Sequence, residues 1–127
     1  MAIVRTALRI LLSLPLAAFF GFVGWMKASA PLATLAQHGA WTVRLPEALG
    51  RVVGVSEIAC ALLLLVGLLP RRARIGAASA LVLIANQGVA AAVHAGAGES
   101  HALPQNAVLV AALALVAWLS RRHFSVR

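Results

Sequence analysis

The stretch from Gly50 to Pro70, GRVVGVSEIACALLLLVGLLP, constrains this chain most, because it is long and apolar enough to cross a bilayer yet carries Glu57. A helix rises about 1.5 Å per residue, so the apolar part from Val52 to Leu69 covers roughly 27 Å, close to the thickness of a hydrocarbon core. A carboxylate inside such a span is costly unless it is paired or faces a cavity. We therefore expect a membrane helix whose acidic residue has a buried partner or a binding role.

Three further apolar runs predict an all-α polytopic membrane protein, a bundle of four transmembrane helices. We expect these helices over residues 6–27, 47–69, 74–94 and 104–120 of a single domain, 1–127. Composition favours the same class, because 62% of the residues are hydrophobic and 11% are charged, against about 25% charged in a typical soluble domain. Too few polar side chains remain to cover a surface that faces water.

Basic residues gather on one side of the predicted membrane. The positive-inside rule therefore predicts that both termini lie in the cytoplasm. The net charge of +8 does not indicate a nucleic-acid partner, because the arginines lie at the ends of apolar runs, where lipid headgroups and topology signals require them. The basic residues of this side are Arg5, Arg9, Arg71, Arg72, Arg74, Arg121, Arg122 and Arg127.

Small residues predict which helices pack together. In the second run, Gly54 precedes Glu57 by three residues and Ala61 follows it by four, so all three share one helix face. Small residues on a membrane helix let a neighbouring backbone approach closely. We therefore expect Glu57 to point into the bundle, against a small-residue stripe of the first helix that consists of Ala17, Gly21, Gly24 and Ala28.

The segment between the first two spans is less apolar. Leu32 and Leu35 share one side of a predicted short helix over 31–38, which Gly39 would end. Trp41 follows, and we expect it to act as an interfacial anchor. Cys60 is the chain's one cysteine, so an intrachain disulfide is excluded and we expect Cys60 to pack as a small apolar residue.

The order and spacing of several short motifs resemble the DoxX family of small four-helix membrane proteins, in its DoxX-like bacterial branch. The motifs are Gly24-x-x-Lys27, Leu45-Pro46, Gly54-x-x-Glu57, Leu68-Leu69-Pro70, His94 at the end of the third run, and Trp118 before Arg121-Arg122. The resemblance implies a four-helix membrane fold and a location in the bacterial inner membrane. It also implies an association with thiosulfate:quinone oxidoreductase or other membrane oxidoreductase assemblies, and some relatives look like assembly factors for other membrane proteins.

The predicted topology brings Lys27, Glu57 and His94 from three helices into the outer half of the bilayer, with Arg51 and Gln87 nearby. One interpretation is a ligand-binding pocket, in which Lys27 and His94 hydrogen-bond a carbonyl such as a quinone oxygen while Glu57 sets their charge. The alternative is a buried ion pair between Lys27 and Glu57 that fixes the helix register. The sequence assigns no residue a catalytic role.

A metal site is a weaker interpretation. His94, Glu99 and His101 lie within eight residues, and imidazoles with one carboxylate suit zinc or copper. Because polar loop residues are common beside membranes, we predict no metal here.

The leading functional hypothesis is an accessory membrane subunit of an oxidoreductase system that binds a quinone or similar lipophilic molecule in the outer half of the bundle. Its redox centre would belong to a larger membrane or periplasmic partner, because one cysteine and no evident haem or flavin motif cannot carry electrons. The second hypothesis is a non-catalytic scaffold or assembly factor. The third is a stand-alone acid-base enzyme that uses Glu57 and His94. Contact with the lipid bilayer follows from every hypothesis, and homo-oligomerisation stays open.

Overall fold

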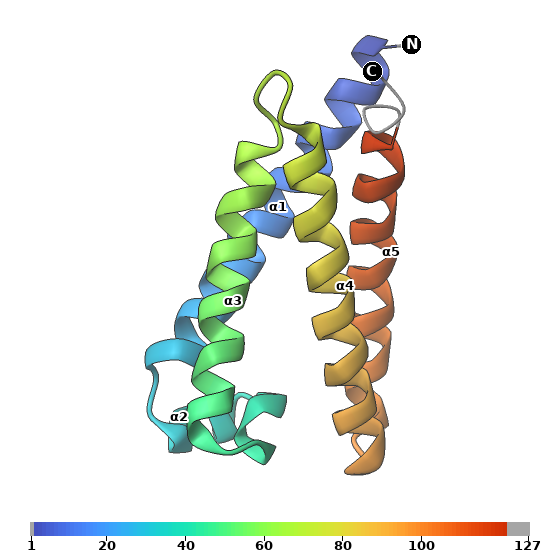
Figure 1. Cartoon of the computed structure of the whole chain (residues 1–127). Coiled ribbons are helices and arrows are strands. Elements are labelled where there is room, and N and C mark those ends of the chain that lie inside the picture. Colours follow the sequence, from blue (N-terminus) through green and yellow to red (C-terminus); the bar gives the residue numbers. More distant parts are fainter. Residues whose placement is uncertain (1, 122–127) are drawn as a thin grey trace.

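The computed structural model describes residues 2–121, and the regular elements in that range are helices. Four of them are long and apolar enough to cross a membrane: α1 (Ala2–Ser29), α3 (Glu47–Val66), α4 (Ala73–Gly96) and α5 (Leu103–Ser120). The short helix α2 (Leu32–Gln37) and the 3₁₀ turns η1 (Trp41–Arg44) and η2 (Ser100–Ala102) lie in the connections (Figure 1). The prediction of an all-α, four-helix membrane fold is thus confirmed.

The helix ends differ from the expected limits where the chain turns. The second long helix, α3, stops at Val66 rather than at residue 69. The next residue, Gly67, lies so close to Gly76 of α4 that a side chain on Gly67 would strike the Gly76 backbone. The chain then leaves the helix through a turn in which Arg71 adopts a φ of 64°. The end of α3 therefore coincides with a close backbone approach to α4.

The two ends of the bundle have opposite chemical character. The start of α1, the α3–α4 connection and the end of α5 lie together at the top of Figure 1. We call this the basic end; Arg122 and Arg127 fall outside the described residues. The chain's three acidic residues are Glu47, Glu57 and Glu99, which all lie toward the other end, on α3 and beside the α4–α5 connection. Because the bundle has an even number of spans, both ends of the described chain lie on the same side of the membrane.

Small residues let α1 and α3 touch through their backbones. A Cβ atom added at Gly54 would lie 2.6 Å from the backbone nitrogen of Ala28 and 2.7 Å from the carbonyl oxygen of Gly24. Farther along the contact, a Cβ at Gly21 would lie 3.8 Å from the Cβ of Ala61. The prediction that these small-residue faces meet is confirmed, and the contact places Glu57 inside the bundle.

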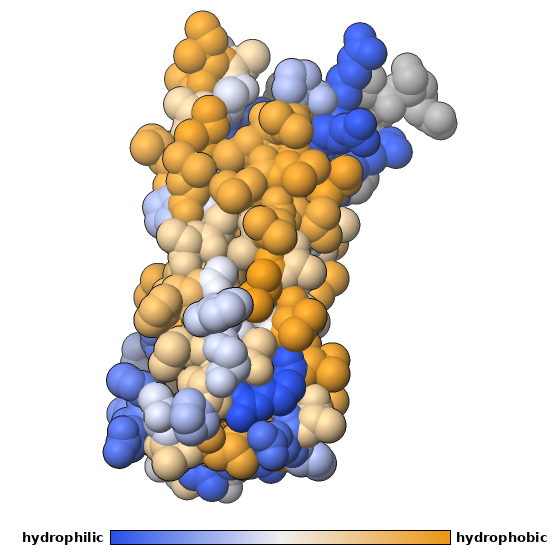
Figure 2. Space-filling model, turned by 90° about the vertical axis from the view of Figure 1, so that its left-hand side faces the viewer, coloured by the Kyte–Doolittle hydropathy of each residue, from blue (hydrophilic) through white to orange (hydrophobic). Residues whose placement is uncertain are grey.

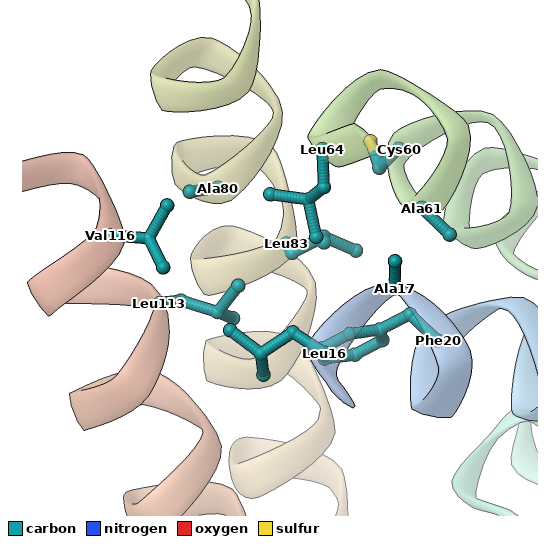
Figure 3. Close-up of a cluster of buried hydrophobic side chains, with 10 residues drawn as sticks. All are labelled: Leu16, Ala17, Phe20, Cys60, Ala61, Leu64, Ala80, Leu83, Leu113 and Val116. Carbon is teal, nitrogen blue, oxygen red and sulfur yellow. The ribbon is translucent and has the colours of Figure 1, made fainter. Parts of the chain in front are cut away.

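The apolar core fills the middle of the bundle and draws side chains from all four long helices (Figure 3). In lipid, burial of an apolar side chain gains little over contact with acyl chains, so the stability of this core depends on close packing. Cys60 packs in this cluster as a small apolar residue. The buried members of the core are Leu16, Ala17, Phe20, Cys60, Ala61, Leu64, Ala80, Leu83, Leu113 and Val116.

The outer surface suits contact with a bilayer. Figure 2 shows hydrophobic residues over most of the upper and middle part of one face, with hydrophilic residues gathered mainly toward the two ends. Large apolar side chains on three different helices, such as Phe22, Leu62 and Val108, are exposed. The protein is therefore a multi-pass membrane protein whose lateral surface contacts lipid.

Candidate functional site

The Lys27–Glu57 pair joins α1 to α3 at the close contact described above. The Lys27 Nζ donates to Glu57 Oε1 at 3.0 Å and to Oε2 at 3.1 Å. Glu57 is 0% exposed, and Lys27 is 8% exposed. Both oxygens of the carboxylate thus bond the same ammonium group, which compensates the cost of placing each charge in an apolar bundle.

Arg51 lies beside this pair but acts on the end of α1. Its Nη1 donates to the backbone carbonyl of Lys27 at 2.8 Å, and its Nη2 lies 3.2 Å from Glu47 Oε2. Carbonyl groups in the last turn of a helix have no partner within the helix, and a cation there stabilises the helix terminus. Arg51 therefore supports the position of Lys27 from α3.

A cavity of about 350 Å³ opens beside Lys27. It lies between α1, α4, α5 and the connection that contains α2 and η1, and neither Glu57 nor Arg51 lines it. Ligand sites for small molecules commonly have volumes of roughly 300–1,000 Å³ and mostly apolar walls with a few polar groups. The apolar part of this wall includes Phe19, Phe22, Val23, Met26, Leu35, Ala90 and Leu109, and the polar part includes Lys27, His38, Gln87, His94, Gln105 and Asn106.

Of the residues that the sequence singled out, the structure brings Lys27, Gln87 and His94 to this one cavity wall. Glu57 lies behind Lys27, and Arg51 lies behind the end of α1. The geometry therefore contains both features that the sequence presented as alternatives. A buried ion pair fixes α1 against α3, and the ammonium of that pair also faces a cavity.

Trp41 also lines the cavity, although we expected it at the membrane interface. That expectation is wrong, because Trp41 is 5% exposed and its ring lies under the Lys27 ammonium, 5.5 Å from Nζ to the ring centroid. The turn η1 folds back under the bundle and carries the indole inward. Its Nε1 has no hydrogen-bond partner among the described residues.

Asn106 of α5 is a polar wall residue that sequence reasoning missed. Its Nδ2 donates to Gln87 Oε1 on α4 at 2.8 Å, and its buried Oδ1 has no partner among the described residues. Buried polar atoms are usually hydrogen-bonded, so an unpaired amide oxygen beside a cavity marks a place that a ligand or a water molecule can satisfy. The sequence feature that could have indicated Asn106 is an amide side chain just after Pro104, at the expected outer end of the fourth apolar run.

Glu99 bridges His94 of α4 and Arg44 of η1 through its two carboxylate oxygens. Its Oε1 lies 2.9 Å from His94 Nδ1, and its Oε2 accepts from Arg44 Nη2 at 2.7 Å. The hydrogen bonds from Arg44 and then from His94 lower the pKa of Glu99 below its ordinary value, so it is a carboxylate at neutral pH. A carboxylate only accepts, so His94 Nδ1 carries the hydrogen and Nε2 is left as an acceptor in the neutral ring.

The metal interpretation gains no geometric support. Within the part of the chain that the structure describes, no group of three or more His, Cys, Asp or Glu side chains comes together in a way that could hold a metal ion. His101 is exposed in η2 and does not line the cavity.

Comparison with known proteins identifies the family. Neither the search of curated proteins nor the search of solved structures gave a match. The family model described as the DoxX-like family matches residues 11–117, a range that includes the Lys27–Glu57 pair and the polar cavity wall on α4 and α5. Since the match spans most of the sequence, this chain belongs to the DoxX-like family.

Proposed function

We propose that this protein is an accessory membrane subunit of an oxidoreductase system in the bacterial cytoplasmic membrane, and that its cavity binds a quinone or a similar lipophilic molecule. The observation that carries the proposal is a largely apolar cavity of about 350 Å³ that has a buried cation, Lys27, and a buried imidazole, His94, on its wall. An ionisable group at membrane depth is costly, so its presence beside a cavity favours a binding role.

The polar groups suit a ring that carries oxygen atoms. The Lys27 ammonium has three N–H donors, and a carbonyl oxygen can accept from it alongside the Glu57 carboxylate. His94 Nε2 can accept from a hydroxyl group, while Phe19 and Phe22 offer aromatic surface to the ring. A bound quinone would supply the ability to carry electrons and protons within the membrane. This chain would bind and orient it.

The proposal assigns the electron-transfer centre to a partner in or beside the membrane, because the chain's single cysteine cannot form a dithiol pair. A stand-alone acid-base enzyme with Glu57 and His94 as the reacting pair is less favoured, because Glu57 is fully buried behind Lys27 and does not line the cavity. The scaffold hypothesis remains the second candidate. The observation that favours it is the Lys27–Glu57 ion pair itself, which has a structural role without any ligand.

Binding of a short-tailed benzoquinol, the reduced form that carries hydroxyl groups, to the purified protein in lipid nanodiscs without oxygen tests the proposal. We expect His94→Phe to weaken binding by about 10-fold, because the hydrogen bond from a quinol hydroxyl to His94 Nε2 is lost. His101→Phe is the matched control, since His101 is a histidine at the same end but off the cavity wall.

Folding of both variants is checked by circular dichroism and thermal unfolding. Equal affinity in His94→Phe, His101→Phe and the unmodified protein would reject the quinone site. In that case, co-purification of a larger membrane protein that survives His94→Phe would favour the scaffold.

A further inference from the structure

At the basic end of the bundle, two arginines share one tryptophan. The guanidinium carbon of Arg121 lies 4.9 Å from the centroid of the Trp118 ring, and that of Arg5 lies 5.5 Å from the same centroid. Arg5 also donates from Nη1 to the carbonyl of Leu119 at 2.9 Å, which ties the start of α1 to the end of α5. Two cations therefore share one aromatic ring that is itself half-exposed.

These cations have donors to spare, and no acidic side chain of the described residues pairs with them. A guanidinium group has five N–H donors, and Arg5 uses one of them for Leu119. Arg9, one turn farther into the membrane, is buried and donates to the carbonyl of Gly67 at 2.6 Å. Because its partner is a neutral carbonyl, the charge of Arg9 adds to the positive charge of this end. The chain's acidic residues all lie toward the cavity end. An arrangement of this kind attracts an anion with several oxygen acceptors.

We propose that Arg5, Trp118 and Arg121 form a binding site for the phosphodiester headgroup of an anionic phospholipid. The fork-shaped donors of arginine match the oxygen atoms of a phosphate, and indole rings are enriched at the level of the headgroups. Basic clusters between membrane helices bind anionic headgroups by the same chemistry. This site lies at the end of the bundle opposite the cavity and is independent of the quinone proposal.

Two leucines favour a lipid over a free phosphate ion. Leu8 follows Arg5 by three residues on α1, and Leu115 precedes Trp118 by three residues on α5, so each lies one helical turn deeper on the same side. Both are exposed to the bilayer. A phosphate held at the arginines would thus have apolar surface directly below it, where the acyl chains of a phospholipid can lie.

Selective quenching of Trp118 tests this site directly. A protein with Trp25→Phe and Trp41→Phe keeps Trp118 as its only tryptophan. In vesicles of phosphatidylcholine, brominated phosphatidylglycerol should quench this fluorescence more strongly than brominated phosphatidylcholine at the same mole fraction. We expect Arg121→Gln and Arg5→Gln each to lower the preference for phosphatidylglycerol by about tenfold, since each variant loses charge-assisted hydrogen bonds to the headgroup phosphate.

Arg72→Gln is the matched control, because it removes the same charge from the same end at an exposed residue of the α3–α4 connection. The preference should be unchanged in this variant. An equal loss in Arg72→Gln and Arg121→Gln would overturn the proposal in favour of diffuse attraction to the surface. Inorganic phosphate added at constant ionic strength should also leave the preference for phosphatidylglycerol unchanged. If phosphate abolishes this preference, the site binds the free ion and the lipid proposal is wrong.

The Arg121 side chain forms no hydrogen bond with the described residues, so Arg121→Gln tests the site even if Arg5→Gln fails to fold.

Discussion

Removal of Lys27 should destabilise this protein more than removal of the charge on Glu57, although the two residues form one ion pair. After Lys27→Met, Glu57 stays 0% exposed and both carboxylate oxygens lose their partner. After Glu57→Gln, the Lys27 ammonium still has the Trp41 ring 5.5 Å away and still faces the cavity, where water can reach it. The two single variants are therefore not equivalent.

The magnitudes follow from this difference. A buried charge left without its partner costs about 3–5 kcal/mol, which we expect for Lys27→Met. The cation–aromatic contact with Trp41 returns about 0.5–2 kcal/mol, so Glu57→Gln should cost less, about 1–3 kcal/mol. The double variant removes both charges, and it should be more stable than Lys27→Met alone, since a pair removed together strands neither member.

Unfolding by sodium dodecyl sulfate in mixed micelles, followed by tryptophan fluorescence, gives the free energy of unfolding for the four proteins of this double-mutant cycle. We expect an interaction free energy of at least about 1 kcal/mol between the two sites. Losses that add to within about 0.5 kcal/mol would refute the reasoning, because independent sites are additive to that degree. Glu57→Gln as the more damaging variant would refute the role given to Trp41 and the cavity.

Two further predictions concern the packing of α1 on α3 and the acid–base behaviour at the cavity end. Gly54→Ala should cost about 1–3 kcal/mol, because its Cβ would lie 2.6 Å from a backbone atom of α1. Gly88→Ala, where no atom of another element lies within 4 Å, should be neutral or stabilise α4 by up to about 1 kcal/mol. The same micelle titration measures both, and equal effects would contradict the close backbone contact. At the cavity end, Arg44 and then His94 lower the pKa of Glu99, so the stability that Glu99 contributes is present above its ordinary pKa of 4.5 and is lost as the pH falls through its lower folded value. Hydrogen exchange of residues 38–44 should thus be faster in Glu99→Gln than in the unmodified protein at about pH 7, and the difference should shrink as the pH falls below 4.5 and Glu99 takes up a proton. A difference that persists in acid would contradict the carboxylate link.

The candidate site could be predicted from the sequence only in part. Lys27, Gln87 and His94 could be assigned to one end of the bundle because spans of known length and alternating direction fix the depth of each residue. That Lys27 and not Glu57 faces the cavity could not be predicted in this way. Depth does not determine which of two neighbouring charged groups is covered by a third helix.

Trp41 and Asn106 illustrate the same limit. A tryptophan in a connecting segment usually marks the membrane interface, but the path of η1 under the bundle turns this one inward. Asn106 gains its role from Gln87, nineteen residues earlier on another helix, and no local pattern links the two.

The sequence by itself determined that this chain crosses the membrane four times, that its arginines mark one side, and that Glu57 shares a face with Gly54. These properties follow from the apolar length and helical period of single segments, which are local. Only the tertiary structure decided that α4 and α5 stand away from the end of α1 and leave a cavity, that Glu99 joins Arg44 to His94, and that Arg5 meets Trp118. Each of these depends on how the helices cross and how the connections fold. Close packing between segments far apart in the chain sets both.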